Sequence, residues 1–334
     1  MAMAKAAARG RTFKSIEECV AALGRLEDAE PQTRALCEMN LEFFRPLGIP
    51  KKGDWLAEKK ESGQTYSTYS RRMKPPLTPS KHTDTVLLVP FGKSFGEGVA
   101  QVFLPHLVEY CRAFFVGMEV VCVEKPLSLA KMQKRSNDFG HDQFLIGDIF
   151  EALNTQTRSY RKAYCRLGIT MEDIYPGEEW NYVFGQAKPL ERVGVFSFAR
   201  HSPYFYSGLH ASQVPSLKEG AGWLRASMHT MVHETCHMFG ILHCVYFQCL
   251  MNGNNGPGDS AGRHSFLCPV CLRKVLLALS FAPGFPGAVP RYQALLQVMR
   301  QIAESFAELE VSEEELSGLL RDVAWLEGRL SSLG

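Results

Sequence analysis

Hydrophobic residues between positions 83 and 171 follow two alternating patterns. Short apolar runs of strand length are separated by longer segments in which apolar residues recur at helical spacing. Strands are predicted at 83–91, 118–123 and 163–171, and helices at 99–117 and 141–153, while residues 125–140 are polar and irregular. The strand at 163–171 is apolar at nearly every position, as a central strand covered on both faces would be. Because strand and helix alternate, we expect an α/β fold with a mainly parallel, twisted sheet.

A different pattern appears at residues 192–200, where apolar side chains alternate with polar or small ones. Such a segment suits the edge of the sheet, and Phe196 to Arg200 is the stretch expected to hold an extended peptide by main-chain hydrogen bonds. Every sheet has an edge, so an edge strand without a binding role is the alternative. Residues 202–222, which precede the next helix, are the candidate gate of a binding cleft.

Helical patterning returns after residue 222. Residues 223–239 contain neither proline nor glycine, and Gly240 can adopt positive φ and end the helix. Further helices are predicted at 272–281, 292–309 and 312–330, the last opened by a capping box of Ser312 and Glu315. The apolar stripes of the last two helices predict a helical hairpin packed on the body. A helix that binds a partner or a second copy is the alternative.

These patterns divide the chain of 334 residues into four parts. Residues 1–82 are an N-terminal extension, helical and then loop-rich, to which we assign no chemistry. Residues 83–243 hold the sheet and the helix that ends at Gly240, and residues 244–285 form a smaller C-terminal helical subdomain. Residues 286–334 form the hairpin. With 46% hydrophobic residues, the chain is long enough to bury a substantial core.

Charge and hydropathy narrow the classes of function. The formal net charge of +2 is too small to indicate binding to nucleic acid or to a membrane surface. No apolar run reaches the length of a membrane span, and the N-terminus lacks the apolar core of a secretory signal. The first 16 residues carry basic side chains and no acid, which fits a disordered tail or a transit sequence. We expect an intracellular monomer, cytoplasmic or also nuclear.

Four of the ten cysteines gather near the end of the predicted body: Cys244, Cys249, Cys268 and Cys271. In a chain without a secretion signal, thiols serve metal ions or simply pack. The other six cysteines are scattered singly, as buried apolar residues would be. The group of four predicts a structural zinc site. A zinc ribbon that contacts nucleic acid or protein is the alternative, although the group lacks a basic stripe.

The strongest pattern in the chain is His233-Glu234-x-x-His237-x-x-Gly240-x-x-His243. Two histidines four residues apart on a helix share a face, so both imidazoles can reach one zinc ion. Glu234 then lies beside the metal as a general base, and the turn at Gly240 lets His243 approach as the third ligand. Cys236 points to another side of the helix and is expected to be a packed thiol. His229, one turn earlier, is a candidate for orienting a ligand.

These residues carry a resemblance. The histidine motif, the Cys244-x4-Cys249-x-Met251 segment and Cys268-x-x-Cys271 resemble the signature of the archaemetzincins, a branch of the metzincin zinc peptidases. The resemblance covers about residues 84–285 and extends weakly to Asp54-Trp55-Leu56. It implies that the three histidines bind a catalytic zinc ion, that the four cysteines bind a second, structural one, and that Met251 lies in a turn beneath the first.

The sequence therefore predicts a zinc-dependent metallopeptidase. The three-histidine site leaves a fourth position open for water, and Glu234 takes the proton of that water and passes it to the leaving amine. The partner expected is a peptide or protein substrate. A zinc-binding pseudoenzyme or peptide-binding protein with little proteolytic activity is the alternative, because cleavage depends on an accessible water and a fitting cleft.

Overall fold

The computed structural model describes residues 12–75, 77–214, 216–254 and 264–333. Most of the basic N-terminal segment, for which a tail or a transit sequence was predicted, lies outside this range. Among the helices described, none combines the length and the apolar character that crossing a bilayer requires.

The central sheet has five strands in the order β2-β1-β5-β8-β7. They are β1 (Thr85–Phe91), β2 (Glu119–Cys122), β5 (Ala163–Thr170), β7 (Gly185–Lys188) and β8 (Val193–Ser197). Neighbouring strands run parallel except for β7, which pairs antiparallel with β8. The predicted α/β class with a mainly parallel sheet is confirmed, and β5 occupies the centre as its apolar sequence indicated.

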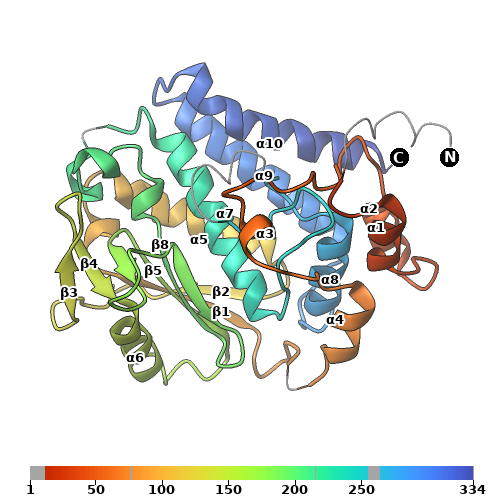
Figure 1. Cartoon of the computed structure of the whole chain (residues 1–334), viewed down its shortest axis with the longest axis horizontal. Helices are drawn as coiled ribbons and strands as arrows, with labels where there is room; N and C mark the ends of the chain where they lie inside the picture. Colours follow the sequence, from red (N-terminus) through yellow and green to blue (C-terminus); the bar gives the residue numbers. More distant parts are fainter. Residues whose placement is uncertain (1–11, 76, 215, 255–263, 334) are drawn as a thin grey trace.

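The two faces of the sheet are buried in separate cores. The covering helices are α5 (Phe103–Phe114), α6 (Ile146–Gln156) and α7 (Gly220–Met238). Along β1, Val86 and Leu88 belong to the core that contains α5 and α7, whereas Leu87 and Val89 belong to the core that contains α6. This division follows the twofold alternation of side chains along a strand. Figure 1 shows α6 on one side of the sheet and α5 with α7 on the other.

Strand β8 is not the edge strand that its alternating sequence predicted. It lies between β5 and β7, and all five of its residues are buried. The alternation comes from packing, because Gly194 makes room for the ring of Phe196. A Cβ atom at position 194 would lie 2.3 Å from that ring, and one at Gly185 on β7 would lie 2.4 Å from it. The edge on this side is β7.

A second sheet of three strands, in the order β3-β4-β6, was missed by the sequence analysis. Its strands are β3 (Lys134–Ser136), β4 (Asp142–Leu145) and β6 (Asp173–Tyr175). The region 125–140 is therefore not wholly irregular, and the helix predicted from residue 141 begins only at Ile146. Tertiary pairing explains the difference: Gln143 and Phe144 pair with Asp173 and Ile174, which keeps this short apolar run extended.

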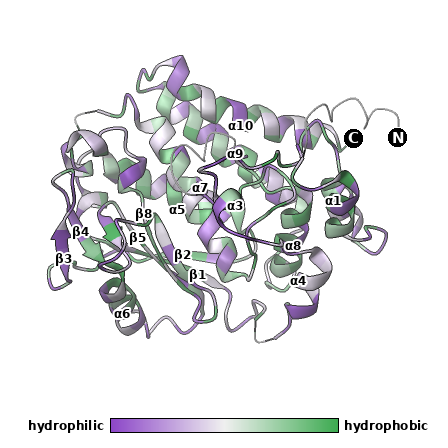
Figure 2. Ribbon diagram, in the orientation of Figure 1, coloured by the Kyte–Doolittle hydropathy of each residue, from purple (hydrophilic) through white to green (hydrophobic). Residues whose placement is uncertain are grey.

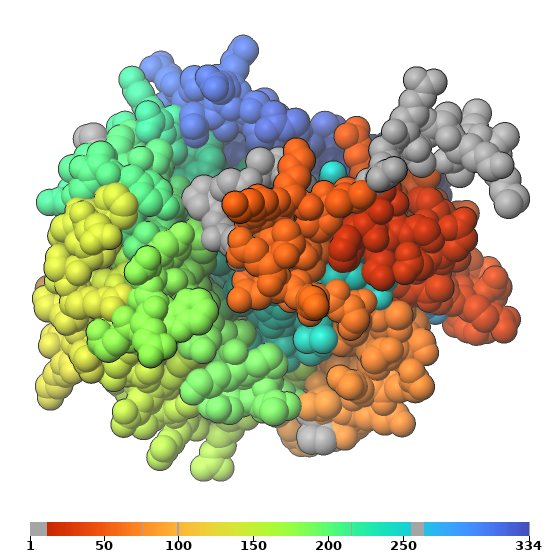
Figure 3. All heavy atoms as spheres, viewed as in Figure 1, coloured from red at the N-terminus to blue at the C-terminus, as the bar shows by residue number. Residues whose placement is uncertain are grey.

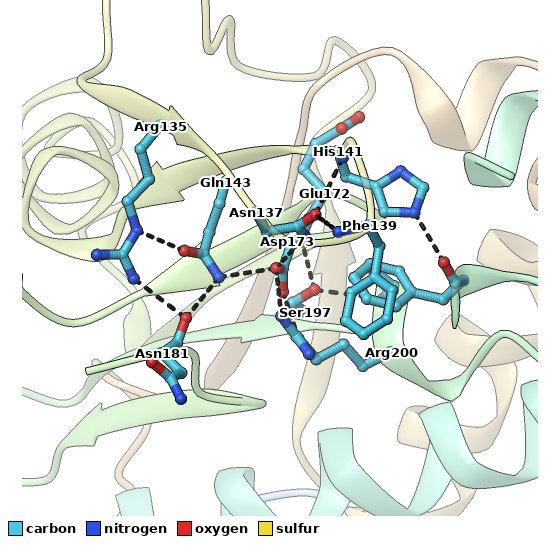
Figure 4. Close-up of polar contacts among 12 residues, drawn as sticks. Arg135, Asn137, Phe139, His141, Gln143, Glu172, Asp173, Asn181, Ser197 and Arg200 are labelled. Atoms are coloured by element: carbon cyan, nitrogen blue, oxygen red, sulfur yellow. Dashed lines mark hydrogen bonds and ion pairs between the residues drawn. The ribbon is translucent and has the colours of Figure 1, made fainter. Parts of the chain in front are cut away.

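A buried polar network joins the second sheet to the segment that leads into α7. Arg200 donates from Nε and Nη2 to the two carboxylate oxygens of Asp173, at 2.8 and 2.7 Å. Asn137 and Gln143 donate amide hydrogens to Asp173 Oδ2, both at 2.8 Å. Figure 4 shows these side chains converging on Asp173. The segment predicted to be a gate thus begins next to a buried ion pair, and its mobility stays a prediction.

The C-terminal part contains α8 (Pro269–Leu279), α9 (Ala288–Ala307) and α10 (Glu313–Ser331). Helices α9 and α10 form a hairpin that packs on α5 and α7, and Figure 2 shows hydrophobic and hydrophilic turns mixed along both. Ser312 caps α10 by accepting the Glu315 amide at 3.3 Å. The predicted capping box is incomplete, because the Glu315 carboxylate accepts the Gly222 amide of α7 at 3.2 Å.

The N-terminal extension wraps around the body. It contains α1 (Ile16–Leu23), α2 (Pro31–Cys37), α3 (Trp55–Glu58) and α4 (Tyr66–Arg72). Pro46 forms an antiparallel bridge with Phe247, and the Leu47 amide donates to Tyr246 O at 3.0 Å. Figure 3 shows this extension lying over the middle of the visible face, in front of the region of α7. The division into four domains stays a prediction.

Candidate metal centres

The helix α7 ends where the histidine motif requires it. Phe239 is the C-cap, and Gly240 follows with φ of 77°. The Gly240 and Ile241 amides donate back to the carbonyls of His237 and Cys236, at 2.9 and 3.2 Å. A positive φ is costly for residues other than glycine, so the predicted role of Gly240 is confirmed. The chain then turns back toward α7 and brings residue 243 beside the helix.

The three histidines of the motif come together. The ring centroids of His233, His237 and His243 lie 4.8 to 5.4 Å apart, and one ring nitrogen from each lies within 4.8 Å of the others. The Nε2 atoms of His233 and His237 are 3.1 Å apart. The His233 ring is buried, and the other two rings are partly exposed. One side of the group is therefore accessible from solvent.

Each imidazole is oriented through its Nδ1 atom. Nδ1 of His233 lies 2.8 Å from the Leu250 carbonyl, and Nδ1 of His237 lies 2.6 Å from the Ile241 carbonyl. Nδ1 of His243 lies 2.8 Å from a carboxylate oxygen of Glu61. These partners only accept hydrogen bonds, so each Nδ1 carries the hydrogen and each Nε2 presents a lone pair.

This donor set fits a zinc ion. Zinc–nitrogen bonds of about 2.0–2.1 Å at tetrahedral angles place the nitrogens about 3.4 Å apart, close to the 3.1 Å between the two helical Nε2 atoms. Burial, together with the neighbouring His243, lowers the pKa of His237 to about 4, so this ring is neutral near neutral pH. Two unprotonated nitrogens facing each other are repulsive until a cation lies between them.

The other candidates around this helix occupy distinct positions. Glu234 is partly exposed, and its Oε1 atom lies 4.0 Å from Nε2 of His233. Cys236 is fully buried, and burial raises the pKa of its thiol, as expected of a packed side chain. His229 Nε2 lies 3.8 Å from Asp322 of α10. The three Nδ1 atoms have other partners, and the orienting role of His229 stays a prediction.

The four clustered cysteines also converge. One sulfur atom from each of Cys244, Cys249, Cys268 and Cys271 lies within 4.8 Å of the others, and all four residues are at most 1% exposed. The sulfurs of Cys244 and Cys268 are 3.6 Å apart. Zinc–sulfur bonds of about 2.3 Å at tetrahedral angles give about 3.8 Å, so this set fits a zinc ion as well.

Hydrogen bonds within the cysteine group favour a thiolate at one of its members. Burial raises the pKa of Cys249 and Cys268, whereas at Cys244 hydrogen bonds from the other three thiols outweigh burial and lower the pKa. Backbone amides of Met251 and Cys268 donate to the sulfur of Cys249, at 3.4 and 3.2 Å. Met251 itself is buried, and its carbonyl accepts the Cys244 amide at 2.7 Å. The turn around Met251 thus touches the residue that follows His243.

Sequence reasoning missed the contribution of the N-terminal extension. Trp55 Nε1 donates to Glu61 Oε1 at 2.9 Å, and the Trp55 ring stands edge-on to His243, with centroids 5.3 Å apart. The Gln64 amide donates to the Gly240 carbonyl at 3.0 Å and accepts from the Leu242 amide at 3.3 Å. The weak resemblance around Asp54-Trp55-Leu56 was the only signal that pointed to this segment.

Comparisons with known proteins indicate the family of the chain. No family model matches the chain. Archaemetzincin-2 of Homo sapiens is 32% identical over 279 residues, covering 77% of this chain and 74% of the relative. Archaemetzincin-1 of Homo sapiens is 30% identical over 294 residues, covering 81% of this chain and 57% of the relative. Among solved structures, archaemetzincin from Methanopyrus kandleri is 22% identical and covers 60% of this chain and 98% of that chain, with a TM-score of 0.43.

The α/β sheet, the histidine helix and these relatives together define a zinc metalloprotease. Sequence identity above 30% over most of both chains identifies the family within this class of enzyme. The chain belongs to the archaemetzincin family. The resemblance stated from the motifs is thereby confirmed.

Proposed function

We propose that this chain hydrolyses peptide bonds with His233, His237 and His243 as the ligands of a catalytic zinc ion. The observation that carries the proposal is the convergence of three imidazoles whose Nδ1 atoms already have acceptors. Each ring is thereby fixed in the tautomer that offers Nε2 to a metal. When bound, the ion supplies a Lewis acid that polarises the carbonyl of a peptide bond.

Glu234 is proposed as the general base. It follows His233 on α7, and its Oε1 atom is 4.0 Å from Nε2 of that residue, close to the metal position without taking part in the ring-nitrogen cluster. A carboxylate there can accept a proton from an attacking water and later donate it to the leaving amine. The partial exposure of Glu234 leaves room for that water and for substrate.

Strand β7 is proposed to hold the substrate, in place of the segment at Phe196 to Arg200. Within the described residues, β7 pairs with β8 on one side and forms the end of the sheet on the other. An extended peptide can pair with such an edge by main-chain hydrogen bonds. Helix α7 packs against β7. Beside the edge lies a hollow of about 490 Å³ whose lining includes Trp180, Val183 and Gln186, which can accept a substrate side chain.

The four cysteines are proposed to hold a second zinc ion with a structural role. Their complete burial leaves no coordination position for a substrate, which is typical of closed thiolate sites. Because Cys244 follows His243 directly, a metal at the cysteine site also fixes the backbone of the third histidine.

The test compares the wild type with Glu234→Gln on a library of diverse peptides, with zinc content measured in both. Glutamine keeps the size of the side chain and removes the base, so zinc content should be unchanged while cleavage falls about 10²–10⁴-fold. Glu124→Gln, which changes a carboxylate outside the site, is the control. If wild type and variant hold equal zinc and neither cleaves, the chain is a pseudoenzyme or a peptide-binding protein.

A further inference from the structure

We infer that Glu61 is a positioning residue of the catalytic zinc site, delivered by an N-terminal strap that we define as residues 54–69. Glu61 lies in sequence 182 positions before His243, yet its Oε1 atom is 2.8 Å from Nδ1 of that ring. The inference rests on the proposed function, because it concerns how the third ligand is held. It assigns a role in the metal site to a segment that precedes the sheet and α7.

The carboxylate of Glu61 is itself fixed in place. Trp55 Nε1 donates to the same Oε1 atom at 2.9 Å, so this oxygen receives two hydrogen bonds. The second oxygen, Oε2, is buried and has no hydrogen-bond partner among the described residues. Leaving a buried carboxylate oxygen unpaired destabilises the fold. Such a cost is typical of a functional site rather than of a residue chosen for packing.

Trp55 packs the strap against two parts of the site, the ring of His243 and the backbone of Gly253. Its indole ring stands edge-on to the His243 ring at an interplanar angle of 84°. The same ring lies against the backbone of Gly253, where a Cβ atom would be only 2.3 Å from the indole. Trp55 therefore fills the space between the third histidine and the residues that follow Met251, and this contact requires glycine at position 253.

Two further strap residues hold the loop that connects the second and third histidines. Gln64, which is 5% exposed, brackets this loop by bonding the Gly240 carbonyl and the Leu242 amide. The Tyr69 hydroxyl donates to the Phe239 carbonyl at 2.9 Å. Gln64 and Tyr69 thus hold the backbone of the loop that leads to His243. Glu61 orients the His243 ring.

The carboxylate distinguishes His243 from the other two histidines, whose Nδ1 atoms face main-chain carbonyls. A carboxylate also fixes the tautomer, but its negative charge additionally raises the basicity of the opposite ring nitrogen. The ligand outside the helix, which has the least local support, thereby receives the strongest orienting partner. Removing such a partner typically weakens metal binding about 10–100-fold.

The experiment measures zinc affinity of the full-length chain by chelator competition, with zinc bound per chain resolved for the two sites. Glu61→Ala should weaken the catalytic site about 10–100-fold and leave the cysteine site filled. Glu61→Gln, whose amide oxygen can still accept from Nδ1, should weaken it less. Glu42→Gln changes an exposed carboxylate of the same extension and is the matched control. In the cobalt-substituted protein, the visible absorption of the histidine site should shift in Glu61→Ala.

Two results would overturn the inference. One is wild-type zinc affinity at the histidine site in Glu61→Ala. The other is an equal loss of zinc from both sites accompanied by unfolding, which would make Glu61 a purely structural residue. The proposed function fails in a different way: the wild type itself would then bind no zinc at the histidines, or would bind it without cleaving peptides.

Discussion

The two proposed metal sites meet at adjacent residues, His243 and Cys244, but they are built in opposite ways. The cysteine site draws all its ligands from residues 244–271, and every one is at most 1% exposed. The histidine site is partly open, and one of its ligands is oriented by Glu61 from a distant segment. A closed local site suits a structural ion, whereas an open site that relies on distant contacts suits chemistry.

The same contrast appears in the loops that carry the ligands. At the cysteine site, Asn252 brackets its own loop: its amide donates to the carbonyls of Cys244 and Phe247 and accepts from the Cys249 amide. At the histidine site, Gln64 does the same for a loop 176 positions away. The N-terminal extension thus contacts the loops of both sites, and at the histidine site Glu61 also hydrogen-bonds the side chain of a proposed ligand.

The largest effect is expected from Cys271→Ser. Loss of one of four ligands should empty the cysteine site and destabilise the chain by more than about 3 kcal/mol, because metal binding contributes directly to folding. Because Cys244 follows His243, we also expect weaker zinc binding at the histidines. Zinc per chain and unfolding by denaturant measure both effects. Cys122→Ser, a partly exposed thiol outside the group, is the control. Wild-type zinc occupancy at the histidines would show that the sites are independent.

A smaller effect is expected from Asn252→Ala, which leaves two carbonyls and one amide without their partner. Unpaired groups of this kind cost about 1–3 kcal/mol each when buried, and partial access of water reduces the sum, so we expect about 2–3 kcal/mol. Asn154→Ala on α6 is the matched control, since its side chain forms no hydrogen bond within the described structure. Equal unfolding midpoints for the two variants would contradict the bracketing role.

The predictability of each site from the sequence follows from the same difference. The proposed ligands, three histidines and four cysteines, are close in sequence, so their spacing predicted which atoms converge. The end of α7 was predictable because Gly240 is a local conformational signal. Glu61 and Trp55 were not, because nothing in a single carboxylate or indole indicates a contact with a ring 182 residues further along.

Prediction of the fold from the sequence meets the same limit, because contacts between residues remote in sequence leave no local pattern. The order of β1, α5, β2, α6 and β5 followed from hydrophobic periodicity, which records burial directly. The position of β8 did not, because small residues under the Phe196 ring produced an alternation that resembled solvent exposure. Strand β4 was missed because four residues are too few for periodicity to separate strand from helix. In both cases the deciding contacts are with residues remote in sequence.

A polar pair away from both proposed metal sites, His210 and Glu172, allows a separate test of how stability depends on pH. His210 Nε2 lies 2.7 Å from Glu172 Oε2, and Ser94 also bonds this carboxylate. The hydrogen bond that His210 donates to Glu172 raises the pKa of His210 against the effect of burial, and the charges of Glu97 and Asp142 add to this rise. Although burial opposes it, the bond to His210 lowers the pKa of Glu172.

The sign of the effect follows from these two shifts. Because the pKa of His210 is raised on folding, its stabilisation is complete below the unfolded value of about 6.5 and is lost as pH rises through the folded value. Because the pKa of Glu172 is lowered, its stabilisation is present above about 4.5 and is lost as pH falls through the folded value. The pair should therefore stabilise the fold most between about pH 4.5 and 6.5.

The measurement compares His210→Gln with the wild type by denaturant unfolding at pH 6 and pH 8, with zinc in excess. The metal ligands titrate in both proteins, so their contribution cancels in the difference, and what remains belongs to the pair. We expect the advantage of the wild type over the variant to be smaller at pH 8 than at pH 6, and the catalytic zinc occupancy to be the same in both. An advantage that does not change with pH would mean that His210 stays neutral and acts only as a hydrogen-bonding side chain.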